Sequence, residues 1–577
     1  MKKNLGARPL APKDIFQDHE AEEVRPPSRT YSFHGNDKVP SIHVVPILPD
    51  EKAQSIRSAG GSSGERGRGK ALQRGLKTRH LTMISLGGTI GTGLFLASGG
   101  SVAEAGPGGS LLAYALIGVL VYFMIQSLGE MATYLPISGS FSTYGARFVD
   151  PAFGFALGWN YWYSWATTLA VELSAAELVM GYWFPNVNGI VWSAIVLVII
   201  LALNLISVKG YGEAEYWFSL TKVLTVVVFV IIGILVATGA VGGHTYGVEN
   251  WKGGQAFLGG FGGTFSVLLA AGFSFQGTEI VGVTAGESSN PRKAVPKAIR
   301  QVFWRILLFY VCALFLIGLI ISPDDPALLN GESDIGSSPF TLVFKAAKLA
   351  GADHAMNAVI LVTVLSAGNS SMYASSRTLY TMAREGKAPR IFGRTNRHGV
   401  PVWSLLLTAV VGALAFLSSL LGTGTVYNWL LSLAGISGFI AWLGISISHY
   451  RFRRAFLYQG HDLSELPYRA MLYPFGPIFA TLAAILVILG QGYSSFTKTP
   501  VDVNQVVSAY IGIPLFLILW FGYKVIRRTK VVPLAQVDLD TGRLVEDTMS
   551  ETQEEDEMGS MGGEGEGKNV FVLERMT

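Results

Sequence analysis

The segment Gly87-Gly88-Thr89-Ile90-Gly91-Thr92-Gly93 interrupts an apolar stretch that runs from about residue 81 to residue 102. Such a stretch is long enough for one bilayer crossing, which takes about 20 residues. Glycines fill its middle, where a continuous helix would otherwise be expected. Backbone that leaves the helix at membrane depth is tolerated only inside protein or beside a cavity. The segment therefore predicts a broken helix that lines a site within a membrane.

A second apolar stretch, residues 262–286, is interrupted at Gly272-Phe273-Ser274-Phe275-Gln276-Gly277. Hydropathy predicts twelve spans in all. They lie near residues 82–104, 109–133, 153–182, 189–207, 215–239, 262–286, 301–322, 354–379, 402–421, 426–449, 473–490 and 506–526. Broken helices in the first and sixth positions indicate two five-helix halves of inverted topology, followed by two further helices. We expect an all-α polytopic membrane protein of the carrier type.

Composition supports this expectation and excludes other classes. Half of the 577 residues are hydrophobic and 15% are charged, against about 25% charged residues in soluble domains. The net charge of +4 gives no reason to expect nucleic acid as a partner, and the single Cys312 excludes an intrachain disulfide. We find no hydrolase elbow, metal-ligand cluster or phosphate-binding loop, and no room for an ATPase domain. We therefore expect no enzyme activity, metal or cofactor, and energy drawn from an ion gradient.

The distribution of basic residues predicts the orientation and the domain boundaries. Lys and Arg cluster before the first span and after the sixth, eighth, tenth and twelfth, whereas the loops 105–108, 183–188 and 422–425 contain none. Basic loops stay in the cytoplasm, so both termini are expected there. The prediction is a disordered tail over 1–80, a twelve-helix membrane domain over 81–526 and a second tail over 527–577. The tails are either inert or regulatory, in which case ubiquitin-ligase adaptors could reach them.

The two breaks predict a site for a zwitterion. The outer half of the first span begins near Gly91, where free N–H groups and the positive end of a helix dipole would hold a carboxylate at Thr92 and Gly93. In the sixth span the outer half ends near Phe273 and Ser274, whose unpaired carbonyls would favour an ammonium group. An amino acid combines both charges. The alternative is that these glycines only let helices pack closely.

Three charged residues lie at membrane depth. Placing a charged side chain there costs about 2.5–3.5 kcal/mol or more of free energy. Lys222 is a candidate for proton exchange; the alternatives are a lysine that bridges helices or extends to the interface. Glu279 could accept a proton, bind substrate or lock a gate, or it could cap a helix. Glu172 could be the counter-charge for a cationic side chain, or a structural partner. Asn369 is more typical of interhelical hydrogen bonding.

Taken in order, these motifs resemble the fungal amino-acid permeases of the amino acid–polyamine–organocation superfamily, from about Leu76 to Lys524. The matching stretches are Gly87 to Phe95, Gln276 to Gly282, Ala285 to Lys293, Ser366 to Ser370 and Ile445 to Phe452. The stretches Gln276–Glu279 and Ile445–Arg451 are more similar to the basic-amino-acid (lysine and arginine) branch than to the broad-specificity branch.

The resemblance implies a LeuT-like fold and proton-coupled import of lysine and arginine across the plasma membrane by alternating access. In bacterial relatives the substrate carboxylate binds at the motif matching Gly91–Gly93. Carbonyls matching Thr89, Phe273, Ser274 and Gln276 bind the amine. A lysine matching Lys222 is the proton-linked group, a carboxylate matching Glu279 is a pH-responsive or gating group, and one matching Glu172 partners a basic side chain.

One departure from the branch leaves the choice between lysine and arginine open. Ala434 stands where the branch commonly offers a hydroxyl near the substrate side chain. Two other functions also stay open, a broad-specificity amino-acid permease and a non-transporting amino-acid sensor.

Overall fold

The computed structural model describes residues 90–137, 139–206, 208–286, 290–329, 338–493 and 503–543, together with Met83, Ser288, Phe496 and Val501. All of these residues belong to one compact unit, Gly67–Thr577. Every regular element in these ranges is a helix, which confirms the all-α prediction. The predicted N-terminal tail and residues 544–577 of the predicted C-terminal tail lie outside the described residues.

Seven helical segments of the described chain are long and apolar enough to cross a membrane. They are Ala97–Tyr134, Tyr211–Ala237, Gly260–Ala285, Ala352–Arg384, Val402–Leu421, Thr423–Tyr458 and Val506–Arg527. Three shorter apolar helices are Gly189–Leu205, Leu308–Ile320 and Phe475–Gly490. These positions agree with the hydropathy pattern and support a multi-pass membrane protein.

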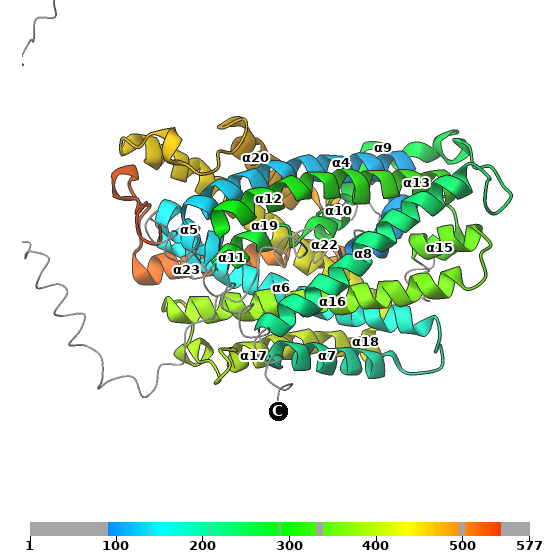
Figure 1. Ribbon diagram of the computed structural model, residues 1–577, viewed down its shortest axis with the longest axis horizontal. Helices are drawn as coiled ribbons and strands as arrows, with labels where there is room; N and C mark the ends of the chain where they lie inside the picture. The colour runs from blue at the N-terminus through cyan, green and yellow to red at the C-terminus, as the bar shows by residue number, and fades with distance from the viewer. Residues whose placement is uncertain are drawn as a thin grey trace, which may run out of the picture. The chain divides into compact units, whose positions relative to one another are not determined.

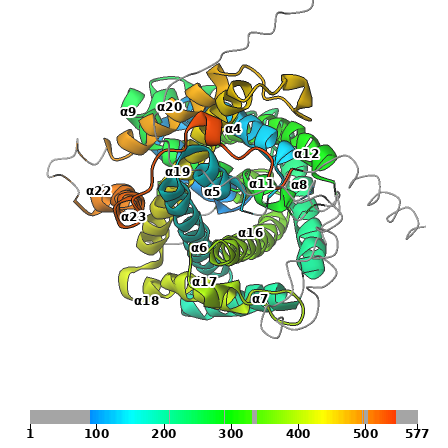
Figure 2. The same cartoon turned by 90° about the vertical axis from the view of Figure 1, so that its left-hand side faces the viewer.

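The long helices pack around a central pair, α6 and α16. The principal helices are α4 (Ala97–Tyr134), α6 (Pro151–Gly181), α7 (Gly189–Ile206), α8 (Val208–Ala237), α16 (Ala352–Arg384), α17 (Val402–Gly412), α19 (Thr423–Tyr458), α20 (Phe475–Gly490) and α23 (Gly512–Arg527). Figures 1 and 2 show α6 and α16 between α4 and α20 on one side and α7 and α17 on the other. The most extensive helix contacts join α6 to α16 and to α19.

Shorter elements complete the bundle. They are α3 (Thr92–Phe95), α5 (Ser140–Tyr144), η2 (Gly145–Val149), η3 (Glu249–Trp251), η4 (Gln255–Phe257), α9 (Gly260–Ser266), α10 (Leu268–Phe275), α11 (Ile280–Ala285), α12 (Pro291–Arg305), η5 (Ile306–Val311), α13 (Cys312–Ile320), α14 (Pro326–Leu329), α15 (Pro339–Ala346), η7 (Arg390–Gly393), η8 (Ala413–Leu417), α18 (Ser418–Leu421), η9 (Leu463–Glu465), α22 (Val503–Tyr510) and η10 (Leu534–Gln536).

The second predicted break lies at the C-terminal end of the expected stretch, and only the downstream side of the first lies within the described residues. The helix after the first break begins at Thr92, with Gly91 extended before it, whereas Gly87 to Thr89 lie outside the described residues. In the sixth span α10 ends at Phe275 and α11 begins at Ile280. Gly277, between them, has a φ of 91°, a conformation that favours glycine.

Small residues let α6 approach its neighbours closely. A Cβ atom on Gly158 of α6 would lie 2.9 Å from Sδ of Met382 in α16, and one on Gly444 of α19 would lie 2.5 Å from Cδ2 of Leu157. Glycine at such crossings brings helix backbones together where apolar burial alone gives little drive within a bilayer. This packing fixes α6, which carries Trp165, Thr168 and Glu172 of the cavity described below.

Glu177, near the end of α6, is a structural anchor. Its carboxylate accepts hydrogen bonds from Ser193 at 2.6 Å, Ser418 at 3.1 Å and Thr423 at 3.2 Å. These donors belong to α7, α18 and α19, so Glu177 ties three elements to α6.

The chain after α23 packs back on the bundle. The Val532 N–H donates to the Val149 carbonyl at 2.9 Å, and Gln459 donates to the carbonyls of Leu534 and Val537 at 2.9 Å. Leu539 is 1% exposed. The predicted C-terminal tail thus begins with a docked segment, residues 529–543.

Candidate functional site

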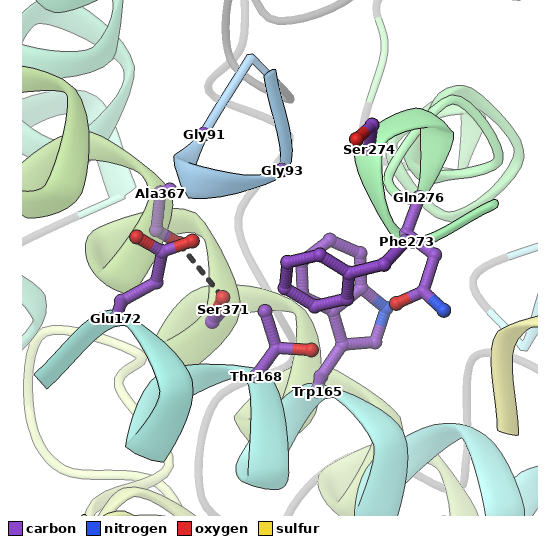
Figure 3. Close-up of a pocket in the computed structure, with 10 residues that line it drawn as sticks. All are labelled: Gly91, Gly93, Trp165, Thr168, Glu172, Phe273, Ser274, Gln276, Ala367 and Ser371. Carbon is purple, nitrogen blue, oxygen red and sulfur yellow. Dashed lines mark hydrogen bonds between the residues drawn. The ribbon is translucent and has the colours of Figure 1, made fainter. Parts of the chain in front are cut away.

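A small cavity lies between the two broken helices and the central pair (Figure 3). Its lining comprises Gly91 and Gly93; Trp165, Thr168 and Glu172 from α6; Phe273, Ser274 and Gln276 at the end of α10; and Ala367 and Ser371 from α16. Its volume is about 30 Å³, room for roughly two water molecules. The cavity is therefore smaller than an amino acid.

Glycine is required where the first break meets its neighbours. A Cβ atom on Gly93 would lie 2.5 Å from Cα of Ser274, and one on Gly91 would lie 3.1 Å from Cβ of Ala367. Real Cβ atoms do not approach backbone as closely as 2.5 Å, so a side chain at Gly93 would push the two breaks apart. The sequence places both breaks in the chain, and the structure brings them into direct contact.

Glu172 extends from α6 to the start of α3. Thr92 donates a hydrogen bond of 3.1 Å from Oγ1 to Oε1 of Glu172. A Cβ atom on Gly91 would lie 3.0 Å from the same oxygen. The other oxygen, Oε2, has no hydrogen-bond partner among the described residues, and the side chain is 2% exposed. Glu172 therefore presents one free carboxyl oxygen at the cavity.

The prediction of unpaired carbonyls at Phe273 and Ser274 is wrong in this structure. The Ser274 carbonyl accepts a hydrogen bond of 2.6 Å from the Tyr310 hydroxyl, and the Phe273 carbonyl accepts one of 3.1 Å from the Gln276 N–H. The helix end is satisfied by a neighbouring helix and by its own turn, as buried helix ends generally are. A carbonyl oxygen has two lone pairs, so each can still accept one further bond.

Glu279 lies beside the cavity but does not line it. Its carboxylate accepts hydrogen bonds from the Trp442 indole at 3.1 Å, the Tyr161 hydroxyl at 3.4 Å and the Gly277 N–H at 3.1 Å. Through these bonds it joins the sixth-span break to α19 and α6. Gln276 adds a further bond of 2.8 Å to the Ala434 carbonyl of α19.

Lys222 is fully buried in α8 and lies outside the cavity lining. It interacts electrostatically with Glu172 and also with Glu215, which stands on its own helix. Glu215 is likewise fully buried. Its carboxylate accepts a hydrogen bond of 2.6 Å from Ser366 and one of 3.5 Å from Asn369, both in α16.

A larger cavity of about 410 Å³ is lined in part by the start of α4. Its lining includes Glu104, Leu178, Ser266, Asn428 and Tyr427. Tyr427 of α19 is buried, and its hydroxyl lies beside Thr92 and within the electrostatic field of Glu172. The side chain of Tyr427 therefore extends from the lining of the large cavity to Thr92 at the first-span break.

The structure brings together most of the predicted site. Gly91, Thr92, Gly93, Glu172, Phe273, Ser274 and Gln276 meet at one place, with Lys222 and Glu279 beside it. Thr89 lies outside the described residues. Sequence reasoning did not find Trp165, Thr168, Ala367 and Ser371, whose residue types carry no signal for binding.

Sequence reasoning also missed Glu215. The predicted fifth span begins at residue 215, where a carboxylate at the membrane interface needs no explanation. The helix instead begins at Val208, about two turns earlier, which buries Glu215 within it. Within the described residues no group of three His, Cys, Asp or Glu side chains is placed to hold a metal ion.

Comparison with known proteins agrees with this geometry. A family model described as "Amino acid permease" matches residues 80–536. The lysine-specific permease LysP of Escherichia coli is 58% identical over 469 residues, which cover 81% of this chain and 96% of that protein. The histidine permease HisP of Lactococcus lactis is 50% identical over 470 residues, covering 81% and 98%. The lysine-specific permease of Saccharomyces cerevisiae is 40% identical over 485 residues, covering 82% and 79%.

The chain therefore belongs to the amino acid permease family of the amino acid–polyamine–organocation superfamily. It is a multi-pass membrane transporter rather than an enzyme, and the family transports amino acids.

Proposed function

We propose that this protein is a proton-coupled symporter that imports cationic L-amino acids, lysine and arginine, across the plasma membrane by alternating access. The observation that carries the proposal is the placement of Glu172, a buried carboxyl group with one free oxygen at a cavity between two broken helices. A carboxylate there is the natural partner of a basic side chain. Two relatives named as lysine-specific permeases give independent support.

The proposed architecture has twelve spans, the first ten arranged as two inverted five-helix halves. Both termini would lie in the cytoplasm, where the end of the bundle formed by residues 135–150, 451–470 and 524–543 would also lie. The interruptions at Gly91 and at Gln276–Glu279 support this arrangement, because broken helices in corresponding positions mark the substrate site of such carriers. The tails would bind ubiquitin-ligase adaptors that control the amount of carrier at the surface.

In the proposed complex the substrate spans the two breaks. Its carboxylate would bind the backbone of Gly91, Thr92 and Gly93, and its α-ammonium the remaining lone pairs of the Phe273 and Ser274 carbonyls, with Thr89 and Gln276 nearby. The basic side chain would extend toward Glu172. Because the present cavity holds only about two waters, the two broken helices must separate to admit the substrate, as alternating access requires.

Proton coupling is assigned to Lys222 and Glu279. A buried lysine readily exchanges its proton because burial disfavours the charged amine. Lys222 lies within the electrostatic field of Glu172, so its charge depends on whether Glu172 is engaged by substrate. Glu279 joins the sixth-span break to α6 and α19. Its protonation would weaken these contacts of the break with the two helices.

The second candidate function is a permease of broader amino-acid specificity, which the similarity to a histidine permease supports. Histidine is a smaller and only partly charged substrate at neutral pH, and the aromatic lining by Trp165 and Phe273 would suit it. A protein that binds an amino acid without moving it remains the third candidate.

Uptake of labelled L-lysine tests the proposal, in cells that lack their own basic-amino-acid permeases, at acidic and neutral pH and with a protonophore. Unlabelled arginine, histidine and leucine serve as competitors, and Glu172→Gln is the matched variant. We expect acid-stimulated uptake that the protonophore abolishes, that arginine inhibits and leucine does not, and that Glu172→Gln reduces. Inhibition by leucine would indicate a broad-specificity permease, and binding without uptake would indicate a sensor.

A further inference from the structure

We propose that Glu215 is the fixed counter-ion of Lys222, and that it leaves Glu172 free to pair with the cationic end of the substrate. The inference rests on the proposed function and adds a positioning residue to it. Glu215 would not touch the substrate; it would act through Lys222.

The first step concerns the helix that carries both residues. Glu215 and Lys222 are seven positions apart in α8, which places them on one face, about 10 Å apart along the axis. Long side chains on a helix lean toward its N-terminus, which is the direction of Glu215 from Lys222, and Lys222 interacts electrostatically with Glu215. Both side chains are fully buried, where a charge without a nearby opposite charge costs several kcal/mol.

The second step concerns the rigidity of Glu215. Ser366 donates to Oε1 at 2.6 Å and Asn369 to Oε2 at 3.5 Å. Asn369 is itself held by a bond of 2.8 Å from Asn204 of α7 to its side-chain oxygen. Both carboxyl oxygens therefore accept hydrogen bonds from α16, and Glu215 does not line the cavity. Lys222 is the charged residue that acts on it.

The third step concerns competition for Glu172. Lys222 also acts on Glu172, which lines the cavity, whereas Glu215 does not. If Glu172 were the sole counter-ion of Lys222, a substrate ammonium would have to displace a buried lysine from it. A second, immobile carboxyl group removes this conflict, because Lys222 keeps a partner while Glu172 binds substrate.

Ligand binding to the purified full-length protein in nanodiscs tests this role. The probes are L-lysine and L-norleucine, which has the same carbon chain without the side-chain amine. In Glu215→Gln the amine of Lys222 turns to Glu172 and competes with the substrate amine. We expect the Kd for lysine to rise about tenfold or more, with the Kd for norleucine unchanged.

The double variant Glu215→Gln with Lys222→Met distinguishes this role from a merely structural one. Removal of the lysine abolishes the competitor, so the Kd for lysine should return to within about threefold of the wild-type value. Glu213→Gln, two positions away on a partly exposed face of the same helix, is the matched control and should bind like the wild type.

An unchanged ratio of the lysine and norleucine Kd values in Glu215→Gln overturns the inference. If Glu215→Gln does not reach the membrane, rescue of its surface expression by Lys222→Met supports the inference, because an uncompensated buried lysine is then the defect. Failure of that rescue overturns it. A wild-type protein that binds no lysine would instead contradict the proposed function, which keeps the two failures distinct.

Discussion

Thr92 and Glu172 are joined by a hydrogen bond of 3.1 Å between the first-span break and the central helix α6. The bond places a carboxyl group from α6 beside the backbone of Gly91, where the sequence alone predicts the substrate carboxylate. Binding of an amino acid must therefore move Glu172 or share Thr92 with it. In the proposed complex Thr92 binds the substrate carboxylate and Glu172 binds its basic side chain. The Thr92–Glu172 bond would therefore couple binding at the two ends of the substrate.

Replacement of Thr92 by Val tests this link. The valine keeps the shape but removes the donor, which leaves a buried carboxyl oxygen unsatisfied at a cost of about 1–3 kcal/mol. We expect the KM for lysine uptake to rise about tenfold or more, with surface expression retained. Thr92→Ser keeps the hydroxyl and is the matched control. Equal KM values for the two variants would show that the bond does not contribute to binding.

Replacement of Gly93 by Ala tests the contact between the two breaks. The new Cβ would lie 2.5 Å from the Ser274 backbone, and overpacking of this kind costs about 1–3 kcal/mol or more. We expect lysine uptake to be lost. Gly522→Ala is the control, because a Cβ there meets nothing within 4 Å. Normal uptake by Gly93→Ala, measured against surface protein, would rule out close contact between the breaks during transport.

Lys222→Ala tests the proton-coupling assignment. We expect concentrative lysine uptake to be abolished while the protein still reaches the surface, because the proposed proton-exchanging group is gone. Exchange of internal for external lysine in proteoliposomes without a pH gradient should persist, since it needs no net proton movement. Accumulation at the wild-type level would remove Lys222 from the mechanism.

Tyr427→Ala tests whether this side chain separates the two cavities. In a Cys312→Ser background, Ser371→Cys places a reactive thiol in the small cavity. A small cationic thiol reagent should modify that cysteine slowly while Tyr427 is present, and much faster when Tyr427 is replaced by Ala, because the large cavity then opens into the small one. Addition of lysine should slow the reaction. Identical rates with and without Tyr427 would place the access route elsewhere.

Asp150→Asn tests the attachment of the chain end to the bundle. Burial alone would raise the pKa of Asp150, but hydrogen bonds from Lys524, Thr529 and the Ala152 N–H outweigh it and lower the pKa below its ordinary value of 3.8. A carboxylate with a lowered pKa stabilises the fold above its ordinary pKa, and this contribution is lost as the pH falls through the lowered value.

The variant keeps the acceptor that caps α6 but removes the charge. We expect it to lower the free energy of unfolding at pH 7 by about 1–2 kcal/mol. The difference from the wild type should shrink as the pH falls below about 4, the ordinary pKa of an aspartate. This difference in stability is measured by thermal unfolding of the purified proteins across this pH range, with intrinsic fluorescence as the signal. A difference that does not change with pH would mean that the charge of Asp150 has no role.

Much of the fold follows from local properties of the sequence. Apolar stretches of about 20 residues have one stable conformation in a bilayer, because lipid satisfies no backbone polar group. The glycines around Gly91 and the stretch Gln276–Gly277 therefore identified both breaks. The first four residues of the predicted second interruption, Gly272 to Phe275, instead lie within α10. Gly272 packs there against Phe439, and a glycine that admits a neighbour looks the same in sequence as one that breaks a helix.

The candidate site was only partly predictable. Glu172, Lys222 and Glu279 could be found because a charge at membrane depth is costly and therefore rare. Glu215 could not be found in that way, because its burial depends on where α8 begins.

The sequence by itself determined that this chain crosses a membrane many times and breaks two of its helices, since hydropathy and glycine content act locally along the chain. Only the tertiary structure decided which groups meet. Tyr310 donates a hydrogen bond to the Ser274 carbonyl, Thr92 donates one to Glu172, and Lys222 of α8 interacts electrostatically with Glu172 of α6. Each of these pairs joins residues of different helices, so the contact depends on how the helices pack. No local pattern in the sequence encodes that packing.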